Sequence, residues 1–184
     1  MFAALAVAAA LVATTAVALL YNGLVRARQR VREGWAAIDV QLQRRASLVP
    51  NLVEAVRAYA EYERDTLERI TEARGSLRAA QGPSAAARAD AELSAALGHL
   101  FAVAEAYPDL KASERFAQLQ ADLTETENLI AFARNYYNGG VEAYNIKVES
   151  FPSLLVAGAF GFTPAEFFST SEQATPQVPS PLSP

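Results

Sequence analysis

The N-terminal stretch constrains this chain most, because its first charged side chain is Arg26. Residues 1–20 are almost entirely Ala, Val, Leu and Phe, with two threonines. As a helix, about 20 such residues are long enough to cross the hydrocarbon core of a bilayer. A buried core helix is one alternative, but in a protein of 184 residues such a helix is seldom apolar on every face. We therefore predict a transmembrane anchor over residues 1–25.

A cleaved signal peptide is the other interpretation of this segment. Ala16, Val17 and Ala18 form an Ala-x-Ala triplet of the kind found at cleavage sites. Signal peptides, however, usually have an apolar core of about 7–15 residues that follows a basic region. Here the apolar run is longer, and no Lys or Arg precedes it. The pattern favours a retained anchor and leaves open whether cleavage ever occurs.

Basic side chains follow the anchor directly. They are Arg26, Arg28, Arg30 and Arg32. Positively charged flanks stay on the cytoplasmic side, so we expect the N-terminus outside and residues 26–184 inside. The same arginines would attract anionic headgroups, by about 1 kcal/mol each near the surface. Membrane lipids are therefore the first partner that the sequence predicts.

Helical periodicity begins after the arginines. Apolar residues recur at steps of three, four or seven from Val31 to Ile70, which keeps them on one face of a helix. Pro50 interrupts this stretch, and a proline inside a helix removes a hydrogen bond and bends the helix. Pro50 either kinks one long helix or begins a second one, and the sequence does not distinguish these two arrangements.

Two further long helices are expected. The dipeptide Gly82–Pro83 breaks the pattern, and Ser84 can cap the next helix, which ends before Tyr107–Pro108. Ser113 can cap the third soluble helix, which closes at Phe151–Pro152. No stretch alternates apolar and polar residues long enough to indicate a sheet.

We therefore predict an all-α protein. Residues 26–168 should form an antiparallel helical bundle of three long soluble helices, the first kinked or split at Pro50, preceded by one transmembrane helix. Within this range, the apolar segment Leu154–Phe168 should pack back as a loop or a short helix. Residues 169–184 are rich in Ser and Pro and should be disordered, because they bury too little apolar surface.

Composition excludes several kinds of chemistry. The chain has no cysteine, a single histidine (His99) and a formal net charge of −4. Disulfides, thiolate metal sites and multi-histidine centres are therefore excluded. The acidity argues against nucleic acid, because clustered Lys and Arg supply most of the affinity for phosphate backbones. The Glu-x-x-His pair of di-iron bundles is also missing, since Ala96 stands three residues before His99. We predict no cofactor, no metal and no catalytic residue.

Charged side chains on the apolar stripes are the remaining candidates for a site. An unpaired buried charge costs several kcal/mol, so each one must pair across helices, reach water or line a functional cavity. The set is Arg45, Glu63, Arg74, Glu127 and Arg134. We predict a structural polar network, and we expect Glu127 to meet Arg74 if residues 26–80 form one helix.

Short motifs spread over about residues 20–168 carry a family resemblance. They include Tyr21-Asn22-Gly23-Leu24-Val25, Ile38-Asp39-Val40-Gln41-Leu42, Leu48-Val49-Pro50-Asn51-Leu52-Val53-Glu54, Ala102–Lys111, Thr126-Glu127-Asn128, Tyr136-Tyr137-Asn138, Tyr144-Asn145 and Phe151-Pro152. In this order they resemble the LemA family of bacterial proteins. The resemblance implies a single anchor in the inner membrane of a bacterial cell, followed by an antiparallel helical bundle, and it brings no catalytic residue with it.

Two functions of different classes remain. The first is a non-enzymatic, membrane-anchored scaffold that presents its bundle to protein partners of unknown identity or to a second copy of itself. The alternative is an envelope enzyme or enzyme cofactor that uses polar residues of the bundle core, such as Glu127. We expect Glu127 to face an arginine in a scaffold and to line an open cleft in an enzyme.

Overall fold

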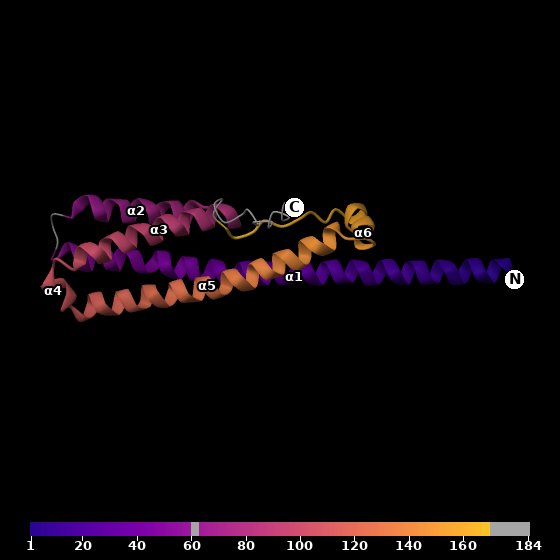
Figure 1. Cartoon of the computed structure of the whole chain (residues 1–184), viewed down its shortest axis with the longest axis horizontal. Coiled ribbons are helices and arrows are strands. Elements are labelled where there is room, and N and C mark those ends of the chain that lie inside the picture. The colour runs from indigo at the N-terminus through magenta and orange to yellow at the C-terminus, as the bar shows by residue number, and fades with distance from the viewer. Residues whose placement is uncertain (60–62, 170–184) are drawn as a thin grey trace, which may run out of the picture. The chain divides into compact units, whose positions relative to one another are not determined.

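The computed structural model describes residues 1–59 and 63–169, and within these ranges the chain forms helices joined by irregular segments (Figure 1). The helices are α1 (Phe2–Arg57), α2 (Arg64–Ala79), α3 (Pro83–Ala104), α4 (Pro108–Lys111), α5 (Glu114–Glu149) and α6 (Ser153–Phe160). The predicted all-α class is confirmed, and α1 contains an apolar stretch long enough to cross a membrane. The predicted disordered tail lies outside the described residues after Ser169.

Two compact units divide the chain. Unit 1 comprises residues 1–38 and 132–167, and unit 2 comprises residues 39–131 with the segment that begins at Phe168. The long helices α1 and α5 contribute to both units.

Unit 2 is an antiparallel bundle of the C-terminal part of α1, α2, α3 and the N-terminal part of α5 (Figure 1). Two ion pairs join α1 to α5 and show which residues of the two helices lie at the same level. They are Arg44 with Glu125 and Glu54 with Arg115, each 2.8 Å between nitrogen and oxygen. Both pairs are exposed, so each contributes about 1 kcal/mol or less. The apolar core supplies most of the stability, and its innermost members are Val49, Leu52, Val56, Ile70, Leu93, Leu100, Leu110, Ile130 and Phe168.

The first soluble helix does not break at Pro50. Helix α1 passes through this exposed proline and ends at Arg57, so the single helix over residues 26–80 is wrong. Pro50 has no N–H to donate to the carbonyl of Ala46. That carbonyl instead accepts a 2.8 Å hydrogen bond from Nε of Arg74 on α2. A tertiary hydrogen bond thus replaces the one that proline removes, and α1 continues for almost two more turns.

The start of α3 also differs from the expected cap. The residue before the helix is Gly82, whose φ of 83° and ψ of 166° favour glycine over any other residue. Pro83 then occupies the first turn, where its missing N–H costs nothing. The hydroxyl of Ser84 does not cap the helix but accepts a 3.0 Å hydrogen bond from Arg88.

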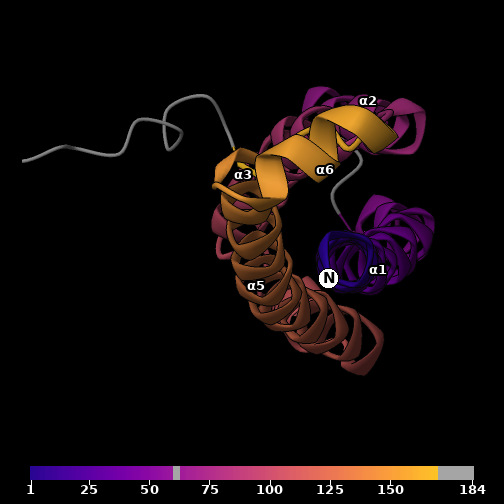
Figure 2. The ribbon, with the colours of Figure 1, turned by 90° about the vertical axis from the view of Figure 1, so that its right-hand side faces the viewer.

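Unit 1 joins the N-terminal part of α1, the C-terminal part of α5, α6 and an extended stretch that follows α6. Figure 2 looks towards the N-terminus of α1. A close approach at Gly34 joins α1 to α5, since a Cβ atom there would lie 3.0 Å from the Cα of Tyr137. The ring of Trp35 lies beside that of Tyr137, with 6.0 Å between the ring centroids. The segment predicted as a loop or short helix forms α6 and the extended stretch.

Candidate functional site

The N-terminal part of α1 presents an apolar surface on all sides. Its most apolar 18-residue window has a mean hydropathy of 2.4, and none of this window is buried. Leu11 and Val12, for example, are 64% and 70% exposed. A buried core helix is excluded by this exposure. Each Å² of apolar surface favours removal from water by about 25 cal/mol, so the surface suits hydrocarbon.

Aromatic rings gather where this uncharged surface ends. The ring centroid of Tyr21 lies 4.9 Å from that of Phe160 and 5.7 Å from that of Phe162. The guanidinium carbon of Arg28 stands 4.7 Å from the centroid of Phe162, in cation–π geometry. We call Tyr21, Phe160 and Phe162 the aromatic collar. The collar marks the boundary between the apolar part of α1 and its arginines.

The other predicted membrane-proximal arginines face solvent. They are Arg26, Arg30 and Arg32, whereas Arg28 is half-buried against the collar. Three guanidinium groups are therefore exposed on α1 after the collar.

Side chains of α5 hold the extended stretch after α6. The hydroxyl of Tyr144 donates a 3.0 Å hydrogen bond to the carbonyl of Thr163. The amide of Asn145 donates to the carbonyl of Ala165 at 3.0 Å and accepts from the N–H of the same residue at 2.8 Å. The described part of the chain contains no strand that could pair with this stretch. The side chains of α5 therefore satisfy its backbone groups.

Tyr137 makes a similar bond deeper in unit 1. Its hydroxyl donates a 2.7 Å hydrogen bond to the carbonyl of Glu166, and the residue is 2% exposed. Burial raises the pKa of Tyr137 to about 12, and the nearby Glu166 carboxylate adds to this effect. Burial likewise raises the pKa of Tyr144, against opposing effects of Arg28 and Arg32.

A buried ion cluster crosses the centre of unit 2. One guanidinium nitrogen of Arg45, on α1, lies 2.8 Å from Asp90 on α3 and 2.5 Å from Glu127 on α5. Arg45 and Asp90 are 3% and 2% exposed, whereas the Glu127 side chain is 44% exposed. The hydroxyl of Ser94 also donates to Glu127, at 3.3 Å. The cluster therefore links three helices through one cation.

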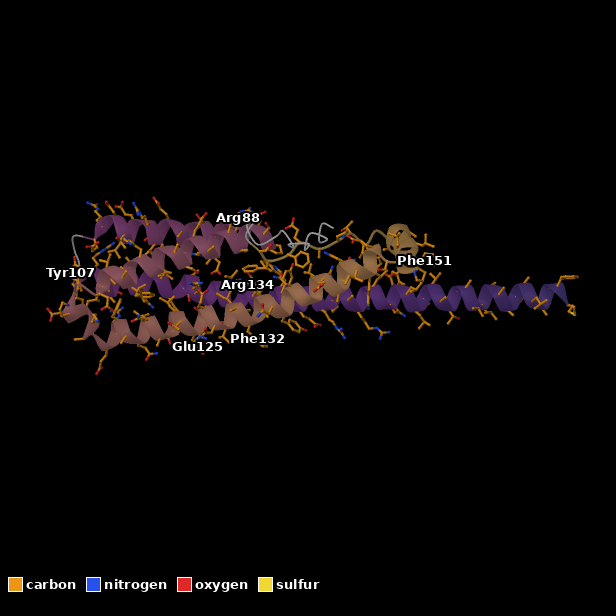
Figure 3. The ribbon with its side chains drawn as sticks, viewed as in Figure 1. Arg88, Tyr107, Glu125, Phe132, Arg134 and Phe151 are labelled. Carbon is orange, nitrogen blue, oxygen red and sulfur yellow. The ribbon has the colours of Figure 1, made fainter. Side chains whose placement is uncertain are left out.

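The remaining residues of the predicted network lie elsewhere. Glu63 accepts hydrogen bonds from Tyr107 at 3.0 Å and from Thr66 at 3.4 Å. The bond to Glu63 raises the pKa of Tyr107, because it favours the protonated phenol. Arg134 belongs to unit 1, where it is half-buried on α5 (Figure 3).

The expected contact between Glu127 and Arg74 is wrong. It assumed that the chain continues in one direction to residue 80, whereas α1 ends at Arg57 and a separate helix follows. Arg74 consequently lies beside Ala46, and Glu127 meets Arg45.

Sequence reasoning missed Asp90, although a signal for it exists. Asp90 stands three residues before Leu93 and seven before Leu97, so helical spacing places it on the buried face of α3. The same rule had singled out Arg45 and Glu127. The alanine-rich surroundings of Asp90 conceal it, because alanines occur on every face of this helix.

An open groove of about 490 Å³ runs between α2 and α3. Charged and polar side chains on its walls include Arg69, Glu72, Glu92 and the exposed His99. Within residues 1–59 and 63–169, no three His, Asp or Glu side chains come close enough together to hold a metal ion. The groove therefore presents separate charges to solvent without a convergent set of ligands.

Comparison with known proteins identifies one family and several relatives. The sequence model of the LemA family matches residues 34–180. Magnetosome protein MamQ 2 of Paramagnetospirillum magneticum is 27% identical, over 80% of this chain and 64% of the relative. Magnetosome protein MamQ of Magnetospirillum gryphiswaldense is 23% identical, over 84% of this chain and 66% of the relative. Protein LemA of Metamycoplasma hominis is 24% identical, over 82% of this chain and 69% of the relative. The chain thus spans just under two thirds of the length of the magnetosome relatives.

Proposed function

The chain belongs to the LemA family, and on this premise we propose that it is a non-enzymatic, membrane-anchored helical scaffold of the bacterial envelope. The observation that carries this proposal is the continuity of α1, which leads without a break from a fully exposed apolar window into residues that are buried in unit 1. Leu24 and Ala27 are already 1% and 7% exposed. This continuity favours a retained anchor over a cleaved signal sequence.

Membrane association has support from the relatives that are named as magnetosome proteins. We place the chain in the inner membrane with its N-terminus outside and its bundle in the cytoplasm. The support is the run of arginines that directly follows the span.

Cysteine labelling tests this orientation, because the chain has no cysteine of its own. Arg88→Cys introduces one thiol at an exposed position on α3 (Figure 3). A membrane-impermeant maleimide should label it only after the inner membrane is permeabilised. Labelling in intact spheroplasts would show that the bundle lies outside the cytoplasm, opposite to the proposed orientation. Extraction of the protein from membranes by alkaline carbonate would refute the anchor.

The scaffold role has support from an exposed aromatic pair on α5. Phe132 and Tyr136 are one helical turn apart and are 75% and 53% exposed (Figure 3). Aromatic side chains are enriched in protein interfaces and depleted from free surfaces. The chemistry of this face suits a protein partner or a second copy of the chain.

Photocrosslinking in living cells tests the scaffold role. A benzophenone amino acid at Phe132 should yield the same defined adduct in repeated experiments, while the same residue at the matched exposed position Arg88 should not. An adduct of twice the chain mass would identify a homo-oligomer. Equal adduct patterns at the two positions would refute a specific partner face.

The enzyme alternative has no comparable observation in its favour. It requires a carboxylate with access to a cleft, whereas the Glu127 carboxylate is bonded by Arg45 and Ser94. We therefore propose a structural role for the Arg45 cluster, and the free energy of unfolding of the Asp90→Asn variant tests it.

A further inference from the structure

Helix α6 is apolar at every position after its first residue, Ser153. Residues 150–165, which include α6, contain no charged side chain. Its inner face, formed by Val156 and Ala157, is buried in unit 1. Its outer face is formed by Leu154, Leu155, Gly158 and Ala159, all of which are exposed. In an amphipathic surface helix that face would be polar.

Large apolar side chains extend this exposed surface beyond the outer face. Leu155 is 65% exposed, Phe160 at the end of α6 is 57% exposed, and Phe151 at the corner between α5 and α6 is 79% exposed (Figure 3). Scattered single exposures of this kind are ordinary, but a contiguous apolar patch marks a surface that another medium covers.

The position of α6 identifies that medium. Phe160 packs on Tyr21, where the uncharged part of α1 ends, and α6 lies beside α1 in the views of Figures 1 and 2. Arg26 follows five residues later, which is about 8 Å further along α1. The apolar surface of α6 is therefore continuous with that of the span and lies on its membrane side of the arginines.

From this placement we infer that α6 lies in the interfacial layer of the bilayer that α1 crosses, with Leu154, Leu155 and Phe151 inserted among the acyl chains. The inference rests on the anchor proposed above. Lipid is the occupant, and not a soluble partner, because the patch joins a surface that is itself suited to hydrocarbon. The aromatic collar then lies at headgroup depth, the position that tyrosine prefers in membranes.

Spin labelling of the full chain in vesicles of phosphatidylethanolamine and phosphatidylglycerol tests this inference. Three single-cysteine variants carry the label: Leu155→Cys on α6, Val12→Cys in the span and Glu142→Cys at an exposed position on α5. Collisions with oxygen report the bilayer, and collisions with a water-soluble nickel complex report water. Phe151→Cys provides a second α6 position, so that the test does not depend on one substitution.

We expect the ratio of oxygen to nickel collisions at positions 155 and 151 to be several-fold higher than at position 142 and to approach the ratio at position 12. Water-like ratios at 155 and 151, with a bilayer-like ratio at 12, would overturn the inference while the anchor stands. A water-like ratio at 12 would overturn the anchor itself. Exclusion of both reagents at 155 and 151 would show a protein in place of lipid and would also overturn the inference.

Discussion

Pro50 and Arg74 should stabilise the protein in a mutually dependent way. The carbonyl of Ala46 lacks its helical donor because residue 50 is proline, and Nε of Arg74 donates to it at 2.8 Å. A hydrogen bond from a charged group contributes about 1.5–3 kcal/mol, and Arg74 is half-buried. We therefore expect Arg74→Met, which keeps much of the aliphatic stem, to cost about 1.5 kcal/mol.

Restoring the helical donor should reduce that cost. In Pro50→Ala the N–H of residue 50 can bond the carbonyl of Ala46, so the carbonyl no longer depends on Arg74. The Pro50→Ala change alone should stabilise the protein, by up to about 3 kcal/mol. In its background, Arg74→Met should cost about 0.5 kcal/mol, which gives a coupling energy near 1 kcal/mol.

Urea unfolding followed by far-ultraviolet circular dichroism measures the four free energies of this cycle on detergent-solubilised full-length protein. Arg78→Met is the control, because Arg78 is an exposed residue of the same helix. Its cost should stay within about 0.5 kcal/mol in both backgrounds. Equal costs of Arg74→Met with and without Pro50, within about 0.3 kcal/mol, would refute the idea that Arg74 replaces the missing helical bond.

Three further predictions follow from buried contacts. Asp90→Asn should lower the free energy of unfolding by about 3 kcal/mol, because it leaves one cation to a single half-exposed carboxylate; a urea midpoint that hardly moves would contradict a structural role for the cluster. Gly34→Ala should destabilise unit 1 by about 1–3 kcal/mol, since its Cβ would meet backbone at 3.0 Å. In Gly139→Ala the added Cβ would lie in open space, so this change should instead stabilise the protein by about 1 kcal/mol. If the thermal midpoints of the two variants shift in the same direction, the close approach of Gly34 to Tyr137 does not matter for stability. The stability advantage of the wild type over Tyr137→Phe should be constant below about pH 9 and should fall by about 1 kcal/mol between pH 10 and 11, because the unfolded phenol ionises first while the folded pKa is about 12. An advantage independent of pH up to 11 would contradict the raised pKa.

Apolar spacing predicted the all-α class because it requires only local information. The same spacing could not locate the first helix break. Pro50 is the strongest helix breaker in its region, yet a side chain 24 residues further along the sequence supplies the bond that it removes. The actual break follows Arg57, where the described residues Ala58 and Tyr59 carry no glycine or proline signal.

The partners of the charged residues depended on that break. Spacing singled out Arg45 as a charge that needs a partner, and its guanidinium lies between the carboxylates of Asp90 and Glu127. The identity of those carboxylates depends on where the chain reverses, which sets the register between helices. Helical spacing of apolar residues could have placed Asp90 on the buried face of α3. It could not have predicted that Asp90 pairs with Arg45 on α1.

The hydrogen bonds between α5 and the extended stretch after α6 require particular side chains only on α5. In these hydrogen bonds Tyr137, Tyr144 and Asn145 contribute side chains, whereas the stretch contributes only backbone carbonyls and the N–H of residue 165. Any residue has such a carbonyl, and any residue but proline has such an N–H. In other chains with this fold, the three positions on α5 should therefore resist substitution, while positions 163, 165 and 166 should vary freely, with proline alone excluded from position 165.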